Sequence, residues 1–391
     1  MDTETGLIDN IAGRNWGKVD VRGWVNVVLL FGIIFVGALL RLAPVLSAGF
    51  PLNDGGLFYE MVRDLQANNY HLPLYTTYNN LNIPFAYPPL AFFIAGWLND
   101  YLKIDLLVLF RFLPVIFSIL TIPVVYLLAR EFFENEVAFL ATFTFALLVP
   151  GYQWLIVGGG LTRSPAFFTG TIALWVSLKW FKSGHLRYAV LTGLCLGVTL
   201  LFHLEIAWVT FVSTVVIGFF KGRLKRILRG TLIAVPVMLM VSAPYWLTML
   251  ARYGVSIFAR AMGTGNLFAF NIILTKLIFN NYTQESYFTP FAVFALLGWI
   301  YSLMYGEKCL SIWVLVLLFL GPRSINRSIS IPVAYLSTVG IVNVLSPVFR
   351  APRGQYSTGS PLPGSVFAGT SPLFIRNGPY ILRDINFQCL L

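Results

Sequence analysis

Apolar stretches of membrane-spanning length recur along most of the chain, and they constrain its fold more than any other feature. The first runs from Trp24 to Leu46, and another runs from Leu106 to Ala129. A helix needs about 20 apolar residues to cross the hydrocarbon core of a bilayer. Hydrophobic residues make up 57% of the 391 residues and charged residues only 11%, whereas about 25% of a soluble domain is charged. The sequence therefore predicts an all-α polytopic membrane protein.

Ten stretches are predicted to span the membrane. The run from Tyr188 to Phe220 is too long for one helix and is interrupted by His203 and Glu205, so it is divided there. The stretch Pro88–Trp97 offers only about ten apolar residues, and we expect it to form an interfacial or re-entrant helix. The predicted spans are Trp24–Leu46, Leu106–Ala129, Val137–Ile156, Pro165–Phe181, Tyr188–Phe202, Glu205–Phe220, Gly230–Leu250, Thr289–Tyr305, Leu310–Leu320 and Ser330–Pro347.

Basic residues predict the orientation. Segment 1–23 is polar, is basic near the first span and lacks a small-residue cleavage site, so we interpret it as cytoplasmic, followed by a retained first helix. With ten spans, the basic loop Lys221–Arg229 also lies in the cytoplasm, together with Lys179, Lys182 and Arg187, and the long polar loop 48–105 lies outside. The basic residues Arg252, Arg260 and Lys276 fall outside, so the bias is incomplete.

The outer loop 48–105 is where chemistry is expected, because polar loops commonly carry function. Asp54 stands between Asn53 and Gly55-Gly56, where the backbone can turn tightly and approach a ligand closely. The residues that follow alternate at helical spacing and predict an amphipathic helix that lies on the membrane surface. Its apolar face consists of Leu57, Phe58, Met61, Val62 and Leu65.

The same topology brings other polar residues to the outer face, where one site could gather them with Asp54. The G-G-G-L-T-R-S-P turn at 158–165 contributes Arg163. The segment Ala251–Phe288 is also external and is predicted to cover the site as a lid. The other residues predicted to reach this face are Tyr87, His203, Glu205 and Arg323.

Together these residues resemble the GT-C superfamily of polytopic glycosyltransferases, which includes protein mannosyltransferases and lipid A aminoarabinose transferases. The resemblance rests on the first helix, the acidic residue in N-D-G-G-L-F-Y, the amphipathic helix and the Y-P-P-L segment that begins at Tyr87. It is best over residues 24 to about 210 and weaker to about 345. The domain interpretation is a cytoplasmic segment 1–23, a GT-C-like transmembrane domain 24–347 and an irregular tail 348–391.

The resemblance implies transfer of a sugar, hexosyl or pentosyl, from a polyprenyl-phosphate donor to a lipid, glycan or protein acceptor on the extracytoplasmic side of the cell membrane. Asp54 matches the carboxylate that acts as general base in such enzymes, where transfer proceeds with inversion. Cationic side chains such as Arg163 and Arg323 are expected to stabilise the departing phosphate. Two departures are visible: no second acidic residue stands beside Asp54, and none stands near Arg163. The sequence therefore leaves the requirement for a divalent cation open, and no metal ligands are assigned.

Each candidate also has a structural alternative. Asp54 could simply cap a helix or hold a turn. Glu60 fits the solvated face of its helix as well as the site. Arg163, Arg323 and Arg327 could contact lipid headgroups, and Arg111 could pair with Asp105 or bind phosphate. His203 and Glu205 could satisfy each other in a turn, and Tyr87 could belong to an aromatic interface belt.

Several functional classes are excluded or disfavoured. The net charge of +11 is spread over loops, where membrane lipids explain it better than nucleic acid does. Cys195, Cys309 and Cys389 have no metal-ligand spacing, and no nucleotide-binding or hydrolase motif occurs. A lipid-linked substrate carrier and an inactive membrane subunit remain alternatives. The irregular tail 348–391 fits either a disordered cytoplasmic extension or a shortened or frame-altered form of a longer protein.

Overall fold

The computed structural model describes residues 21–51, 54–256, 290–305, 308–320 and 325–350. Within these ranges the chain is mostly helical and its only sheet is a two-stranded hairpin, so the predicted all-α fold is confirmed. Arg323, the tail, the N-terminal segment before Val21 and most of the predicted lid lie outside the described residues. The elements are α2 (Val21–Ser47), α3 (Gly55–Ala67), β1 (Tyr75–Thr76), η1 (Tyr78–Asn80), β2 (Ile83–Pro84), α4 (Leu90–Leu102), α5 (Leu106–Ala129), α6 (Asn135–Leu147), η2 (Val149–Gly151), α7 (Gly160–Ser183), α8 (Leu186–Phe202), α9 (Leu204–Lys221), α10 (Leu224–Tyr253), α13 (Pro290–Tyr305), α14 (Lys308–Leu320), α15 (Ile325–Ser328), α16 (Ser330–Gly340), η4 (Ile341–Leu345) and α17 (Ser346–Arg350).

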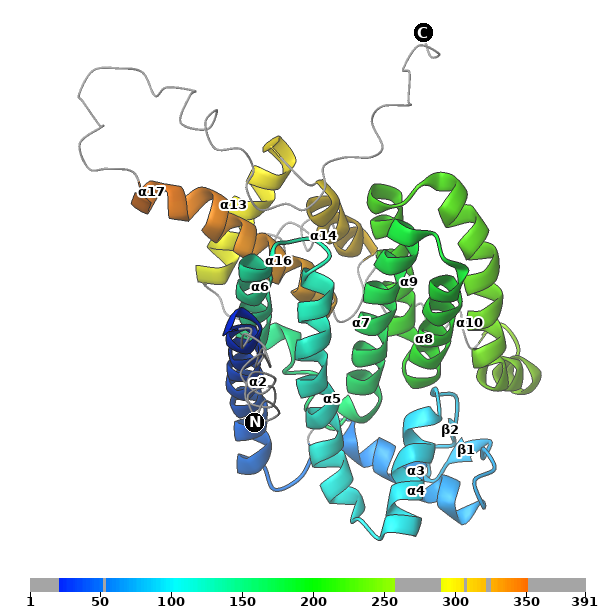
Figure 1. Ribbon diagram of the computed structural model, residues 1–391. Coiled ribbons are helices and arrows are strands. Elements are labelled where there is room, and N and C mark those ends of the chain that lie inside the picture. Colours follow the sequence, from blue (N-terminus) through cyan, green and yellow to red (C-terminus); the bar gives the residue numbers. More distant parts are fainter. Residues whose placement is uncertain (1–20, 52–53, 257–289, 306–307, 321–324, 351–391) are drawn as a thin grey trace, which may run out of the picture.

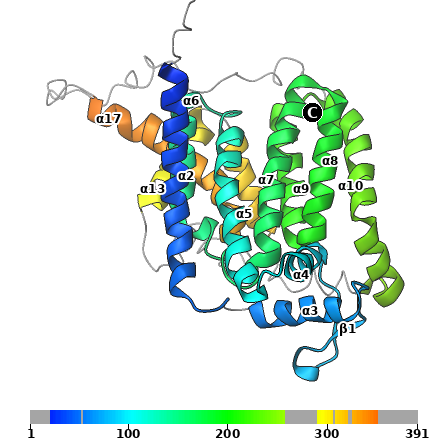
Figure 2. The same cartoon turned by 60° about the horizontal axis from the view of Figure 1, so that its bottom comes forward.

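The long helices form a bundle with α2 at one edge and α10 at the other (Figures 1 and 2). Among the described helices, α2, α5, α9 and α10 are long and apolar enough to cross a membrane, and other predicted spans are shorter apolar helices of 10–17 residues. The outward faces of the edge helices carry large hydrophobic side chains, for example Phe31 on α2 at 67% exposure and Leu232 on α10 at 78%. Such a surface suits lipid rather than water, as expected of a membrane protein.

The predicted span Val137–Ile156 extends too far toward its C-terminal end. Helix α6 stops at Leu147, and Leu148 has an extended backbone with ψ of 100°. Pro150 follows in the short turn η2, and proline has no N–H with which to continue the hydrogen bonding of a helix. Helix α7 in turn begins at Gly160, before the predicted start at Pro165, so that Arg163 belongs to its first turn.

Helices α3 and α4 lie together at one end of the bundle (Figure 1). The amphipathic helix is present, and Phe58, Met61, Val62 and Leu65 are all buried on it. These side chains pack against protein, for example Phe58 against Phe92 of α4 with ring centroids 5.2 Å apart. This corrects the expectation that the apolar face of α3 would rest on lipid. Helix α4 has only 13 residues, too few to span a bilayer.

The loop between α3 and α4 is fastened at several points. The Asp64 carboxylate of α3 accepts hydrogen bonds from the Thr76 hydroxyl at 2.7 Å and the Thr77 N–H at 2.9 Å. Helix α10, far away in sequence, reaches the same loop: Arg252 donates to the Leu72 carbonyl at 2.9 Å and Tyr245 donates to the Ala86 carbonyl at 3.0 Å. The residues on both sides of the hairpin are therefore held by α10 as well as by α3.

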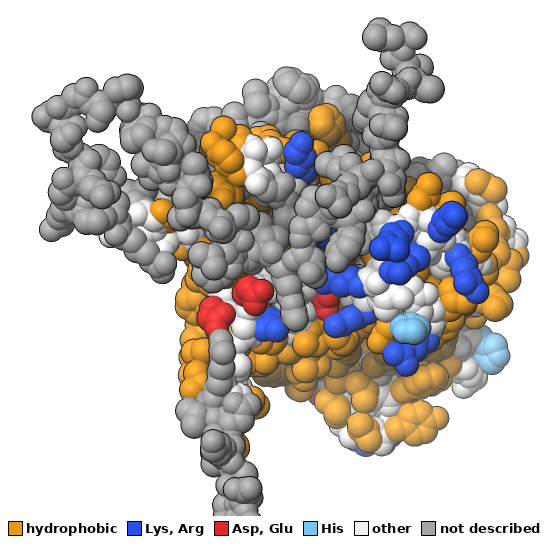
Figure 3. Space-filling view, turned by 45° about the horizontal axis from the view of Figure 1, so that its top comes forward, with side chains coloured by type: hydrophobic (Ala, Val, Ile, Leu, Met, Phe, Trp, Pro, Cys, Tyr) orange, Lys and Arg blue, Asp and Glu red, His pale blue; other side chains and the backbone are white. Residues whose placement is uncertain are grey.

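The opposite end of the bundle is basic. Lysine and arginine side chains gather there over the ends of α7 to α10 (Figure 3). The buried carboxylate of Glu131 forms ion pairs with Lys179 and Lys182, each at 2.6 Å. Arg226 donates to the Lys182 carbonyl at 2.6 Å and so ties the start of α10 to the end of α7. The basic loops and the α3–α4 end thus lie at opposite ends of the bundle.

Candidate functional site

An ion pair between Asp54 and Arg163 joins the start of α3 to the start of α7. Arg163 Nη2 lies 2.7 Å from Asp54 Oδ2, and the side chains are 19% and 46% exposed respectively. Asp54 precedes α3 at its capping position, but its side chain makes no capping hydrogen bond. The carboxylate is therefore directed to the arginine rather than to the helix, which argues against the capping alternative. The pairing also means that Arg163 is no free headgroup-binding arginine.

Glycine at position 159 makes room for this ion pair. A Cβ atom there would lie 2.4 Å from Arg163 Nη1 and 2.9 Å from Asp54 Oδ2, closer than real Cβ contacts. A Cβ on Gly55 would lie 3.5 Å from the Gly158 Cα atom, which is an ordinary van der Waals contact and shows that the two glycine segments lie side by side. The glycines were interpreted as space for a bulky ligand, but in the structure they allow α3 and α7 to approach until their charged side chains meet.

Tyr87 forms an aromatic wall next to the ion pair. Its ring packs edge-on against Phe58 at 4.9 Å and against His203 at 5.8 Å between centroids. Its hydroxyl lies 3.5 Å from the Thr162 hydroxyl, beside Arg163 in α7. The ring thus packs within the protein rather than in an interface belt. Burial raises the pKa of the Tyr87 phenol, so the group stays neutral at ordinary pH.

His203 occupies the junction between α8 and α9. Its Nδ1 accepts a hydrogen bond from the Ile206 N–H at 3.4 Å and so caps α9, while its ring faces Tyr87. Burial, together with the positive charges of Arg327 and Arg163, holds the pKa of His203 well below its usual value. The residue therefore has a structural role in the turn and also lines the wall as a neutral imidazole.

A second charged pair, Arg327 with Glu205, lies near the first. Arg327 in the short helix α15 is buried at 2% exposure, and its Nη2 lies 3.8 Å from Glu205 Oε2. Sequence reasoning favoured Arg323, which lies outside the described residues, over Arg327. The described structure instead places Arg327 at the site. Glu205 pairs with this arginine, whereas the sequence suggested mutual satisfaction with His203.

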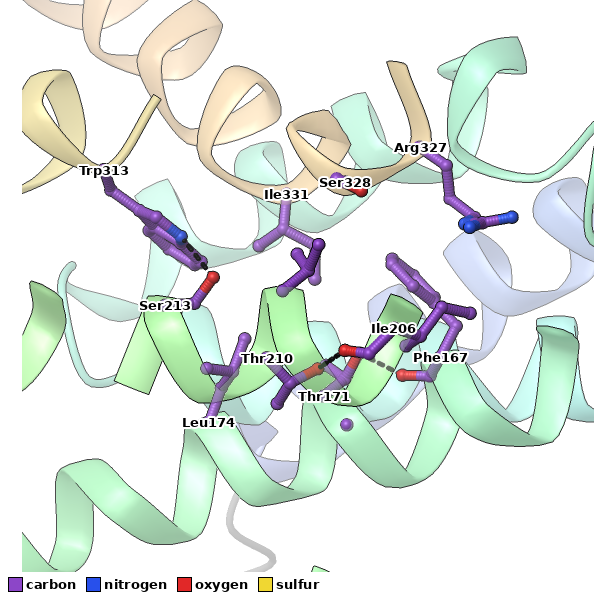
Figure 4. Close-up of a pocket in the computed structure, with 12 residues that line it drawn as sticks. Phe167, Thr171, Leu174, Ile206, Thr210, Ser213, Trp313, Arg327, Ser328 and Ile331 are labelled. Atoms are coloured by element: carbon purple, nitrogen blue, oxygen red, sulfur yellow. Dashed lines mark hydrogen bonds between the residues drawn. The ribbon is translucent and has the colours of Figure 1, made fainter. Parts of the chain in front are cut away.

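A small, largely apolar cavity of about 20 Å³ lies beside Arg327 between α7, α9, α14 and α16 (Figure 4). This is room for about one water molecule. The hydroxyls of Thr171 and Thr210 donate to carbonyls one turn earlier in their helices, and that of Ser213 accepts from Trp313. The cavity therefore offers acceptor oxygens on one side and a guanidinium on the other.

Two other candidates are placed away from the ion pairs. Glu60 on α3 is half-buried and makes no ion pair or hydrogen bond with the described part of the chain. Arg111 donates to the Val45 carbonyl at 2.9 Å, while Asp105 caps α5 by accepting from the Leu107 N–H at 2.8 Å. The alternative of an Arg111–Asp105 pair is therefore not seen.

The described residues do not provide a protein-held cation site. No three or more His, Cys, Asp or Glu side chains among them lie together, and Asp54 is paired with an arginine. A divalent cation needs several oxygen ligands, although substrate phosphates can supply some of them. This donor set does not fit a cation bound by the protein alone.

Sequence reasoning missed that Asp54 and Arg163 contact each other. It assigned them separate tasks, one on the acceptor and one on the phosphate. The sequence held one indication of this contact. Asp54 is followed by two glycines, Arg163 comes three residues after a run of three glycines, and both residues were predicted to lie at the outer face. Phe58 and Thr162 were also not connected with Tyr87, because nothing in their spacing indicates that contact.

Comparison with known proteins identifies the fold. No protein-family model and no curated protein match the sequence. Among solved structures, the chain is similar to ArnT from Cupriavidus metallidurans bound to undecaprenyl phosphate, with TM-score 0.57, 16% identity and coverage of 83% of this chain and 61% of that one. It is also similar to the oligosaccharyltransferase AglB from Archaeoglobus fulgidus in complex with an inhibitory peptide and a dolichol-phosphate, with TM-score 0.54, 15% identity and coverage of 89% and 54%. The chain shares the fold of these two proteins, in agreement with the resemblance seen in the sequence, and it covers only 61% and 54% of their lengths.

Proposed function

We propose that this chain is a multi-pass membrane glycosyltransferase that moves a sugar from a polyprenyl-phosphate donor to an acceptor hydroxyl. The observation that carries the proposal is the Asp54–Arg163 pair at the α3–α4 end of a GT-C fold. One member can accept a proton and the other can bind a phosphate. The neighbouring structures of ArnT and AglB contain undecaprenyl phosphate and dolichol-phosphate, and this supports a lipid of that class as the donor.

In the proposed reaction Asp54 takes the proton of the acceptor hydroxyl. The acceptor oxygen forms a bond to the anomeric carbon from the face opposite the phosphate, and the configuration of that carbon is inverted. The bond between the anomeric carbon and the phosphate oxygen breaks, and its electron pair leaves with the lipid monophosphate. Arg163 and Arg327 offset the charge of this leaving group, which is the role that preorganised cations fill most effectively.

Tyr87 and His203 also belong to the proposed site, but they do not change their protonation state there. Both are neutral, because burial raises the pKa of Tyr87 and lowers that of His203. They are therefore suited to pack against the sugar or the lipid rather than to move protons. Asp54 is left as the proposed general base.

The proposed topology has ten spans, a cytoplasmic N-terminus and an extracytoplasmic site. The separation of the basic loops from the α3–α4 end supports it, because basic loops are retained in the cytoplasm. Single cysteines at positions 75 and 225, both exposed, test it in a variant that lacks the natural cysteines. A membrane-impermeant maleimide should label position 75 in intact cells and position 225 only after lysis. Labelling of position 225 in intact cells would overturn this arrangement.

The decisive experiment is sugar transfer by the purified protein from polyprenyl-phosphate sugars to lipid, glycan and peptide acceptors. Asp54→Asn should lower the rate by about 10² to 10⁴, the usual contribution of a general base. Glu60→Gln removes another carboxylate of α3, one that forms no ion pair within the described residues, and is the matched control, with a rate close to wild type. Near-normal transfer by Asp54→Asn would contradict the role of Asp54. If the wild type transfers no sugar from any donor, the proposed enzyme activity is contradicted, and a carrier or an inactive subunit is favoured.

A further inference from the structure

Under the proposed function Arg163 binds two anions, the carboxylate of Asp54 and the phosphate of the donor. The structure shows it paired with Asp54. Its Nη2 lies 2.7 Å from Asp54 Oδ2. The guanidinium occupies Oδ2 of the carboxylate and the space beside it, where an acceptor hydroxyl has to approach the base. The same guanidinium is proposed to bind the donor phosphate. The two roles conflict as long as Arg163 stays where it is.

We propose that Arg163 exchanges partners: the phosphate of the polyprenyl donor takes the guanidinium from Asp54 and thereby frees the base for the acceptor. This step rests on the proposed function. It assigns Arg163 a coupling role, in which the donor site and the base communicate through one side chain.

The geometry favours the exchange. Arg163 is the inner member of the pair at 19% exposure and Asp54 the outer member at 46%. The positive charges of Arg163 and Arg327 both act on Tyr87 and His203, so the two guanidiniums lie around the same aromatic wall. The charges of both arginines favour an anion beside this wall, whereas the only ion pair of Asp54 among the described residues is with Arg163.

The energetics point in the same direction. An ion pair with a half-exposed member contributes little stability, while a guanidinium binds phosphate through two parallel charge-assisted hydrogen bonds. The guanidinium lies directly beside the backbone at Gly159, where a Cβ would be 2.4 Å from Nη1, and it is joined to its own backbone by a long side chain. The backbone of α7 can therefore stay in place while the guanidinium moves.

The exchange predicts that donor binds before acceptor. Until a phosphate arrives, Asp54 is held by Arg163 and cannot assist a hydroxyl. After it arrives, the carboxylate is free and is exposed on the side from which an acceptor can enter.

The test is the affinity of the purified protein for undecaprenyl phosphate in detergent. Asp54→Asn removes the competing anion and should tighten binding about threefold, the size of a weak exposed ion pair. Asp54→Ser should do the same and serves if the first variant does not fold, because serine keeps the capping preference without the charge. Glu60→Gln is the matched control, and its affinity should equal that of the wild type.

A double-mutant cycle shows whether Arg163 carries the effect. Arg163→Gln should weaken binding, and adding Asp54→Asn to it should then change nothing. Equal tightening by Asp54→Asn in both backgrounds would mean that Asp54 simply repels the phosphate, and unchanged or weaker binding by Asp54→Asn alone would mean no competition. Either result would overturn the exchange and leave the proposed enzyme intact. Failure of the wild type to bind the lipid phosphate at all would overturn both the exchange and the proposed function.

Discussion

The crossing of α13 and α16 allows a quantitative prediction, because two glycines bring these helices into backbone contact. A Cβ on Gly298 would lie 1.8 Å from the Leu336 carbonyl oxygen, and a Cβ on Gly340 would lie 2.0 Å from that of Phe294. Real Cβ atoms essentially never come closer than 3.0 Å. Alanine at position 298 must therefore move the helices apart by about 1.2 Å (3.0 − 1.8). Helix α16 follows directly on α15, so this shift would also loosen Arg327.

The expected cost is the sum of two opposing terms. Overpacking at a close contact costs about 1–3 kcal/mol, and alanine gains about 1 kcal/mol over glycine in a helix interior. Gly298→Ala should thus lower the free energy of unfolding by up to about 2 kcal/mol. Gly32→Ala on α2 is the matched control, because a Cβ there meets nothing within 4 Å. It should be neutral or stabilising by up to about 1 kcal/mol.

Unfolding in mixed micelles of dodecyl maltoside and increasing SDS, followed by tryptophan fluorescence, measures both effects. Gly340→Ala should resemble Gly298→Ala, and the double variant should lose less than the sum of the two. Once one alanine has separated the helices, the second meets less resistance. If Gly298→Ala proves as stable as Gly32→Ala, or if the two losses simply add, the close crossing does not determine stability as argued.

Three further predictions concern single side chains. Gly159→Ala should lower transfer at least about tenfold without unfolding the protein, because its Cβ would lie 2.4 Å from Arg163 Nη1 and displace the guanidinium that is proposed to bind the donor phosphate; circular dichroism gives the folding control. Tyr87→Phe should change the rate less than tenfold and leave its pH profile unaltered below pH 10, because burial raises the phenol pKa above its usual 10; a lost alkaline limb would contradict this. Burial disfavours ionised Glu131, but hydrogen bonds from two lysines of α7 outweigh it and lower its pKa below 4.5. Glu131→Gln should therefore cost about 1 kcal/mol above pH 4.5, and the difference should vanish as the pH falls through the lowered value; a difference independent of pH would refute the pairing.

Helix positions were the most predictable part of the fold. Helix α5 occupies the predicted Leu106–Ala129, because Asp105 caps its start and a mostly apolar stretch of 24 residues follows. The buried face of α3 was predictable for the same reason, since its apolar residues recur at helical spacing. What covers that face was not predictable, because lipid and α4 satisfy an apolar surface equally well.

The site was predictable as a set of residues but not as a set of contacts. Four candidates were predicted to lie on the outer side of the membrane, and the structure brings all of them to one end of the bundle. They are Asp54, Arg163, Tyr87 and His203. The ion pair was out of reach, because it depends on how closely α3 and α7 approach, and sequence spacing says nothing about that distance. Arg323 stays a prediction, because it lies outside the described residues. The contact of Arg327 with Glu205 was not predicted, because it depends on the course of α15.

The contacts of α10 with the loop that precedes α4 link the bilayer to the site. Helix α10 has 30 residues, or about 45 Å at 1.5 Å per residue, whereas the hydrocarbon core is about 30 Å thick. An overlong helix adapts to a thinner bilayer by tilting or bending. Because Tyr245 of α10 holds the carbonyl of Ala86, the residue before Tyr87, α10 cannot tilt without pulling on the aromatic wall. We therefore expect sugar transfer to depend on the acyl-chain length of the lipids around the protein, which reconstitution in bilayers of graded thickness can measure.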